Sequence, residues 1–137
     1  MKPLSWAALA VGAAFVAGWL VGASGRSASE VAAGRAVEEA AFLSARALVL
    51  EGRVHLYQDN FGDARRAFTD AHTVVTTLQR RLRETGLGER AGLLEVGLGY
   101  LTQAADQATA LDPGAQSAAE AALQTLDSIR ATSAPSR

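Results

Sequence analysis

Residues 52–71 of the chain read GRVHLYQDNFGDARRAFTDA. The pair Asp59-Asn60 interrupts a helical pattern in this stretch, and either residue can cap the helix that follows. Small residues on both sides of this turn would let two antiparallel helices approach closely, while one aromatic side chain fills the space between them. The sequence therefore predicts a helical hairpin whose contact is set by four hairpin-packing residues: Gly52, Ala64, Phe68 and Ala71.

The chain after residue 26 is expected to be helical throughout, since no alternating strand pattern occurs in it. A capping box, SASE at 27–30, predicts the start of a helix that runs to about residue 57, and a second helix follows from about 61 to 84. Turn residues TGLG and DPG then delimit a third helix and a fourth. The third helix is predicted at about 89–111. The chain as a whole is predicted to divide into a transmembrane signal-anchor at 1–26, one long hairpin at 27–84, a second hairpin at 85–130 and a disordered tail at 131–137.

The segment from about residue 45 to residue 75 resembles a tetratricopeptide repeat, because the four hairpin-packing residues have the spacing of that repeat's small, small, aromatic and small positions. The match is one degenerate repeat: Glu51 and His55 stand where the family has a large apolar residue and a tyrosine, and the later proline is missing. The resemblance implies an all-α fold. We expect a single transmembrane helix followed by a four-helix, tetratricopeptide-like domain of antiparallel hairpins.

The same resemblance implies a binding face on the first helix of the hairpin. Four residues would form this partner-binding stripe at helical spacing: Arg46, Val49, Arg53 and Leu56. Two arginines beside two apolar side chains would suit an acidic, partly apolar peptide. The alternative is that both arginines are solvated and pair with nearby carboxylates such as Glu38, Glu39 or Asp59, with little gain in stability.

The first part of the chain is strongly apolar. Residues 3–25, PLSWAALAVGAAFVAGWLVGASG, carry no charged side chain, and about 21 helical residues reach roughly 30 Å, the thickness of a bilayer's hydrocarbon core. Lys2 precedes the segment, which favours a cytoplasmic N-terminus and a periplasmic helical domain at a bacterial inner membrane. The alternative is a cleaved signal peptide, because Val21-Gly22-Ala23 resembles a cleavage site.

Small residues recur within this segment, and four of them share one face of a helix: Ala10, Ala14, Gly18 and Gly22. Such a stripe lets another transmembrane helix approach closely, so it predicts a lateral contact in the membrane. The alternative is that alanine and glycine are simply abundant there. Because the span contains no ionisable side chain, an ion path or a proton path through it is not expected.

Few side chains in the sequence suggest chemistry. The chain has no cysteine and a formal net charge of −1, which argue against thiol or disulfide chemistry and against a nucleic-acid partner. Neither His55 nor His72 belongs to an HxxxH or HxxE pattern of the kind that metal sites use. No serine or threonine has a histidine or lysine at a sequence spacing typical of a nucleophile and its base. We expect no catalytic residue, no metal site and no cofactor.

One basic cluster is present, Arg80-Arg81-Leu82-Arg83, at the predicted C-terminus of the second helix. Cations are favourable there because of the helix dipole, and this is a sufficient structural explanation. The alternative is that Arg80, Arg81 and Arg83 meet anionic lipid or an acidic partner surface.

The sequence favours a membrane-anchored protein–protein interaction or scaffold protein with an exported helical domain and no catalytic activity. Its expected partners are other protein subunits, membrane proteins above all, and the lipid bilayer, and self-association stays open. The alternative is a small single-pass accessory subunit that stabilises a large respiratory, photosynthetic or secretory membrane complex through the span itself.

Overall fold

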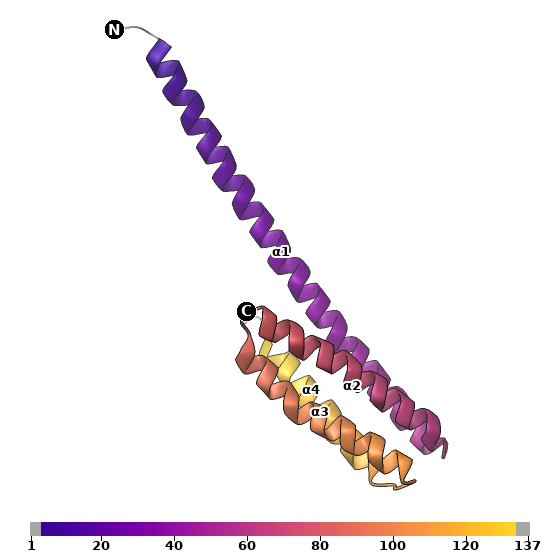
Figure 1. Ribbon diagram of the computed structural model, residues 1–137. Coiled ribbons are helices and arrows are strands. Elements are labelled where there is room, and N and C mark those ends of the chain that lie inside the picture. Colours follow the sequence, from indigo (N-terminus) through magenta and orange to yellow (C-terminus); the bar gives the residue numbers. More distant parts are fainter. Residues whose placement is uncertain (1–3, 134–137) are drawn as a thin grey trace. The chain divides into compact units, whose positions relative to one another are not determined.

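The chain folds into four α-helices joined by short turns (Figure 1). The structure is a computed structural model that describes residues 4–133, with side chains described for residues 28–132. The helices are α1 (Leu4–Tyr57), α2 (Phe61–Glu84), α3 (Gly88–Thr109) and α4 (Ala115–Ser133). The predicted all-α fold class is confirmed, and no strand occurs among the described residues.

The chain divides into two compact units, Met1–Val37 and Glu38–Arg137. The second unit contains the end of α1 together with α2, α3 and α4, and we call it the bundle. Within the described residues, no helix is both long and apolar enough to cross a bilayer. The span predicted at 3–25 and its packing residues Ala10, Ala14, Gly18 and Gly22 lie outside the part of the chain whose side chains the structure describes.

The helix boundaries agree with the sequence in the middle of the chain and differ at both ends. The second helix has the predicted bounds. The predicted helix start at 27–30 is wrong, because α1 continues through this stretch without a break. The predicted disordered tail is wrong for residues 131–133, since α4 continues to Ser133, and residues 134–137 are outside the described residues.

Each turn of the bundle depends on a particular residue. Asn60 caps α2, since its side-chain Oδ1 accepts a hydrogen bond from the Asp63 amide at 3.3 Å. Gly86 ends α2 with a φ of 79°, a conformation that costs glycine little. Before α4, Asp112 Oδ1 accepts a hydrogen bond from the Gly114 amide at 2.7 Å, and α4 begins one residue later. These short turns make successive helices antiparallel.

The four helices close into a ring. Gly52 of α1 faces Phe68 of α2, and Gly97 of α3 lies against Leu126 of α4. Between α2 and α3, the buried Gln79 donates from Nε2 to the carbonyl oxygen of Ala91 at 3.0 Å. Finally α4 returns to α1, which places all four helices around one core. This is the arrangement of an up-down-up-down bundle, whereas stacked repeats contact their sequence neighbours only.

The core of the bundle is made mainly of alanine and leucine, and Phe68 is its largest fully buried side chain. Two apolar side chains next to the core are less buried than the rest. Val74 is partly buried, and Leu111 is 66% exposed because it lies in the turn after α3 with a φ of 55°. Alanine-rich contacts let the helix axes approach closely, so the packing depends on shape more than on large side chains.

Candidate functional site

The four hairpin-packing residues lie together at the contact between α1 and α2. Ala64, Phe68 and Ala71 are fully buried, and Gly52 is buried as well. A Cβ added at Gly52 would lie 2.8 Å from Cδ1 and Cζ of Phe68, well below a normal van der Waals distance. The Phe68 ring therefore rests directly on the backbone of α1, and the role of this set is packing.

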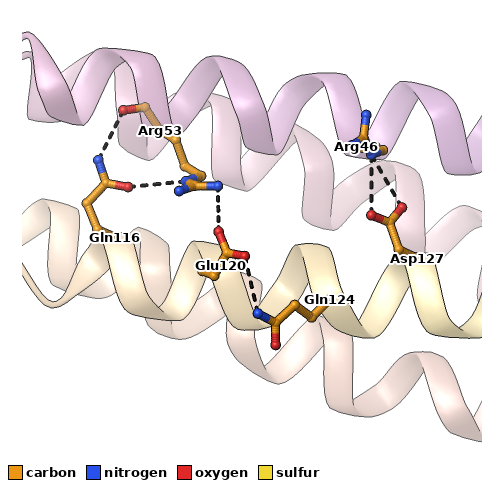
Figure 2. Close-up of polar contacts among 6 residues, drawn as sticks. All are labelled: Arg46, Arg53, Gln116, Glu120, Gln124 and Asp127. Carbon is orange, nitrogen blue, oxygen red and sulfur yellow. Dashed lines mark hydrogen bonds and ion pairs between the residues drawn. The ribbon is translucent and has the colours of Figure 1, made fainter.

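The predicted partner-binding stripe of α1 faces α4 of the same chain. Figure 2 shows Arg46 and Arg53 projecting from α1 towards α4. Arg46 Nε lies 3.3 Å from Asp127 Oδ1, and Arg53 Nη1 lies 2.6 Å from Glu120 Oε2. The two apolar members of the stripe, Val49 and Leu56, are buried in the core.

Arg53 is also tied to α4 by a reciprocal pair of hydrogen bonds (Figure 2). Its Nε donates to Gln116 Oε1 at 3.3 Å, and Gln116 Nε2 donates to the Arg53 carbonyl oxygen at 3.2 Å. The α4 side chains that meet the two arginines are therefore acidic or polar, and acidic groups are part of the chemistry expected of a bound peptide. Binding of a partner at the stripe stays a prediction, and it requires α4 to move away.

Two carboxylates of α1 also pair with arginines of other helices in the bundle. Glu39 accepts a hydrogen bond from Arg130 of α4 at 2.8 Å, and Glu38 pairs with Arg90 of α3. The hydrogen bond and the charge of Glu39 raise the pKa of Arg130. Both carboxylates thus pair with arginines on other helices and not with Arg46 or Arg53.

The basic cluster at the end of α2 is mostly paired. Arg80 Nη1 lies 3.4 Å from Glu84 Oε1, and Arg83 Nη2 lies 3.6 Å from Glu95 Oε2 of α3. Arg81 is exposed on the same last turn of the helix. These positions suit the helix dipole, and a contact of the cluster with lipid or with an acidic partner stays a prediction.

A feature that sequence reasoning missed is an exposed apolar stripe on the face of α1 that points away from the bundle. Its members lie three or four residues apart, and all are exposed. The large ones are far from buried: 47% of Leu43, 52% of Val54 and 75% of Tyr57 remain accessible. We call this set the outer α1 stripe: Ala40, Leu43, Ala47, Leu50, Val54 and Tyr57.

The outer α1 stripe lies on the side of the helix roughly opposite the core residues Ala45 and Gly52, as the 100° step of an α-helix requires. α1 therefore carries two apolar faces, one used by the bundle and one uncovered within the described chain. The signal was present in the sequence, since the spacing of three, four, three, four and three is a heptad pattern. It was hidden because a helix with apolar residues on two faces looks uniformly apolar.

The two histidines lie on different helices of the bundle, α1 and α2. Among the described residues no three histidine, cysteine, aspartate or glutamate side chains are grouped as a metal site requires. His55 lies on α1, with its Nε2 3.8 Å from Glu51 Oε1, while His72 lies on α2 with its Nδ1 3.5 Å from the Thr76 hydroxyl. Each histidine interacts with a residue one turn away on its own helix, so the two act separately.

Reversing one charge of the Arg53–Glu120 pair should weaken the bundle, while exchanging both should not. Arg53→Glu or Glu120→Arg alone places like charges together at a half-buried position, and we expect a loss of about 1 kcal/mol in the free energy of unfolding. The double exchange should recover at least half of that loss. The measurement is urea unfolding of the full chain in a mild detergent, followed by circular dichroism.

The control for this exchange is Arg66→Glu, which reverses an exposed pair with Asp63 three residues away on α2. A change within about 0.5 kcal/mol is expected there. Equal losses at Arg53 and Arg66 would mean that the polar ties between α1 and α4 do not position these helices.

Comparison with known proteins gives no relative from which a site could be transferred. No protein-family model, no curated protein and no solved structure matches the chain.

Proposed function

We propose that this chain is a membrane-anchored scaffold protein whose helical bundle holds another protein chain and catalyses no reaction. The observation that carries this proposal is the outer α1 stripe. A single exposed leucine or valine is ordinary on a protein surface, but six aligned apolar side chains over five turns of one helix are typical of an interaction face.

The composition of the stripe supports a helical partner. Tyr57 is the most exposed of the large apolar side chains of the bundle that the structure describes, and tyrosine is frequent among the residues that dominate binding energy. Apolar anchors spaced along one helix face are the form in which helices are recognised by other helices or by grooves. The other apolar face of α1 is filled by α2, α3 and α4, so the outer face is the one open to a partner.

The membrane anchor in this proposal comes from the uncharged sequence at 3–25. With the N-terminus in the cytoplasm, the bundle would stand on the periplasmic side of a bacterial inner membrane. The tetratricopeptide resemblance then applies to the tight α1–α2 hairpin. This hairpin holds α1 in place, but the residues of the outer α1 stripe are not part of the hairpin contact.

A second candidate is the accessory subunit, favoured by the small-residue pattern Ala10, Ala14, Gly18 and Gly22. In this case the span would be the main contact. Gly18→Leu would then release the protein from its complex, while changes on the outer α1 stripe would not.

The test is photo-crosslinking of the full chain in the membranes of its own cells. A photoreactive residue in place of Leu50 should give a defined product with a second polypeptide, and the same residue in place of the exposed Thr73 on α2 should not. The product should disappear when Leu43→Arg is added on the same face. The proposal would be wrong if neither the Leu50 nor the Thr73 position gave a product, or if both positions gave the same product.

A further inference from the structure

We infer that the occupant of the outer α1 stripe is the same stripe of a second copy of this chain, in a parallel, in-register pair of helices. This inference rests on the proposed function and adds the identity and the direction of the partner. Three observations support it: the spacing of the stripe, its choice of side chains and the charges beside it. The proposed anchor adds a common direction.

The spacing is that of a coiled coil. From residue 40 to residue 57 the apolar positions alternate by three and four residues, which is a repeat of 3.5 residues. A strict repeat of this kind keeps one seam facing a second helix with the same repeat, whereas a surface that packs on a globular groove has no need of it. In the sequence the same spacing continues upstream at Ala36 and Ala33.

The side chains fit two strands. In heptad notation, a is the position four residues after d, and d is three residues after a. The a positions are Ala40, Ala47 and Val54, and the d positions are Leu43, Leu50 and Tyr57. Leucine at d with a β-branched residue at a favours parallel dimers, and Leu50 with Val54 is one such combination. Alanine at a brings the two helix axes close together, which lets the leucines of the neighbouring d layers pack across the seam.

The charges beside the seam are compatible with the parallel register. In such a pair each g residue meets the e residue five positions later on the other helix. Arg46, which also pairs with Asp127 of its own chain, would meet Glu51 of the second copy, an attractive pair, and both side chains remain partly accessible in one copy. The other two meetings, Glu39 with Ser44 and Arg53 with Gln58, put no like charges together.

Direction follows from the anchor. Two copies held by their first residues in one bilayer start from the same surface, so neighbouring α1 helices run the same way.

The absence of cysteine from the sequence makes the test direct. Single-cysteine variants of the full chain, Leu43→Cys, Leu50→Cys and Val54→Cys, would be reconstituted at low density in phospholipid vesicles and oxidised. In a parallel, in-register pair each of these positions lies close to its own copy, within the 4.4–6.8 Å that disulfides typically span between Cα atoms. Each variant should therefore form a disulfide-linked dimer, while the control Thr73→Cys on the exposed face of α2 should stay monomeric.

A second variant tests whether the disulfides form by random encounter of two copies. Leu50→Arg added to Val54→Cys places a charge in the seam and should lower the yield of linked dimer by about tenfold or more. The helical content of this double variant should be unchanged, since Leu50 lies outside the core.

Three results would overturn the inference. Linkage at one position only would indicate a crossed or antiparallel pair, equal linkage at Thr73→Cys would indicate random contact, and no linkage at all would mean that the stripe does not bind its own copy. The proposed function is judged separately. If the Leu50 photo-crosslink joins the chain to a different polypeptide while no cysteine variant dimerises, the scaffold proposal stands and this inference fails.

Discussion

Phe68→Ala is expected to lower the free energy of unfolding of the bundle by about 3–5 kcal/mol, because it removes the largest fully buried side chain. The ring fills the space between α1 and α2 and contacts the backbone at Gly52, where no side chain can take its place. The gap would stay open, since closing it would require two helices fixed by a tight turn to move together. Urea unfolding of the full chain in a mild detergent, followed by circular dichroism, measures the change.

The control for Phe68→Ala is Leu93→Ala on α3, where 49% of the side chain is exposed. Because this leucine contributes little buried surface, a loss below about 1 kcal/mol is expected. If Phe68→Ala cost no more than Leu93→Ala, the α1–α2 contact would not be the centre of the fold.

The hairpin at the middle of the chain could be predicted from the sequence because its signals are local. Asp59-Asn60 marks the turn, Asn60 caps α2 as expected, and the bounds of α2 follow from the apolar spacing and from Gly86. Each of these features depends on residues within a few positions of one another. Interactions of that kind depend little on the rest of the fold, so they can be recognised in a single sequence.

The closure of the bundle could not be predicted in the same way, because it joins residues far apart in the chain. Arg46 and Arg53 look alike whether they await a partner or pair with α4, and the choice depends on where Glu120 and Asp127 come to lie. The start of α1 shows the same limitation. The capping box at 27–30 is a real local preference, but such a box starts a helix only where none precedes it, and α1 already includes these residues.

These two outcomes together change the view of the candidate site. Because α4 covers the inner face of α1, the side chains there stabilise the bundle, and the outer face becomes the surface available to a partner. The apolar residues of that outer face contribute little to the core, so changes to them should separate binding from folding. The single-residue variants Leu50→Arg and Phe68→Ala are therefore complementary: the first should affect association alone, and the second stability.

Gly52→Ala and Gly99→Ala should shift stability in opposite directions, although both replace a glycine by alanine within a helix. Alanine improves helix propensity by about 1 kcal/mol at either position. At Gly99 of α3 a Cβ would meet no atom within 4 Å, so the full gain is expected. At Gly52 the added Cβ would collide with the fully buried Phe68 ring, and overpacking of this kind costs about 1–3 kcal/mol.

We therefore expect Gly99→Ala to raise the urea midpoint and Gly52→Ala to lower it, with a net loss of up to about 2 kcal/mol for the latter. The cause can be isolated in a Phe68→Leu background, where the smaller side chain leaves room at Gly52. Gly52→Ala should become neutral or stabilising there, because the propensity gain remains after the collision is removed. A loss at Gly52 that persisted in this background would show that the ring is not what requires a glycine, and that the spacing of the hairpin has another origin.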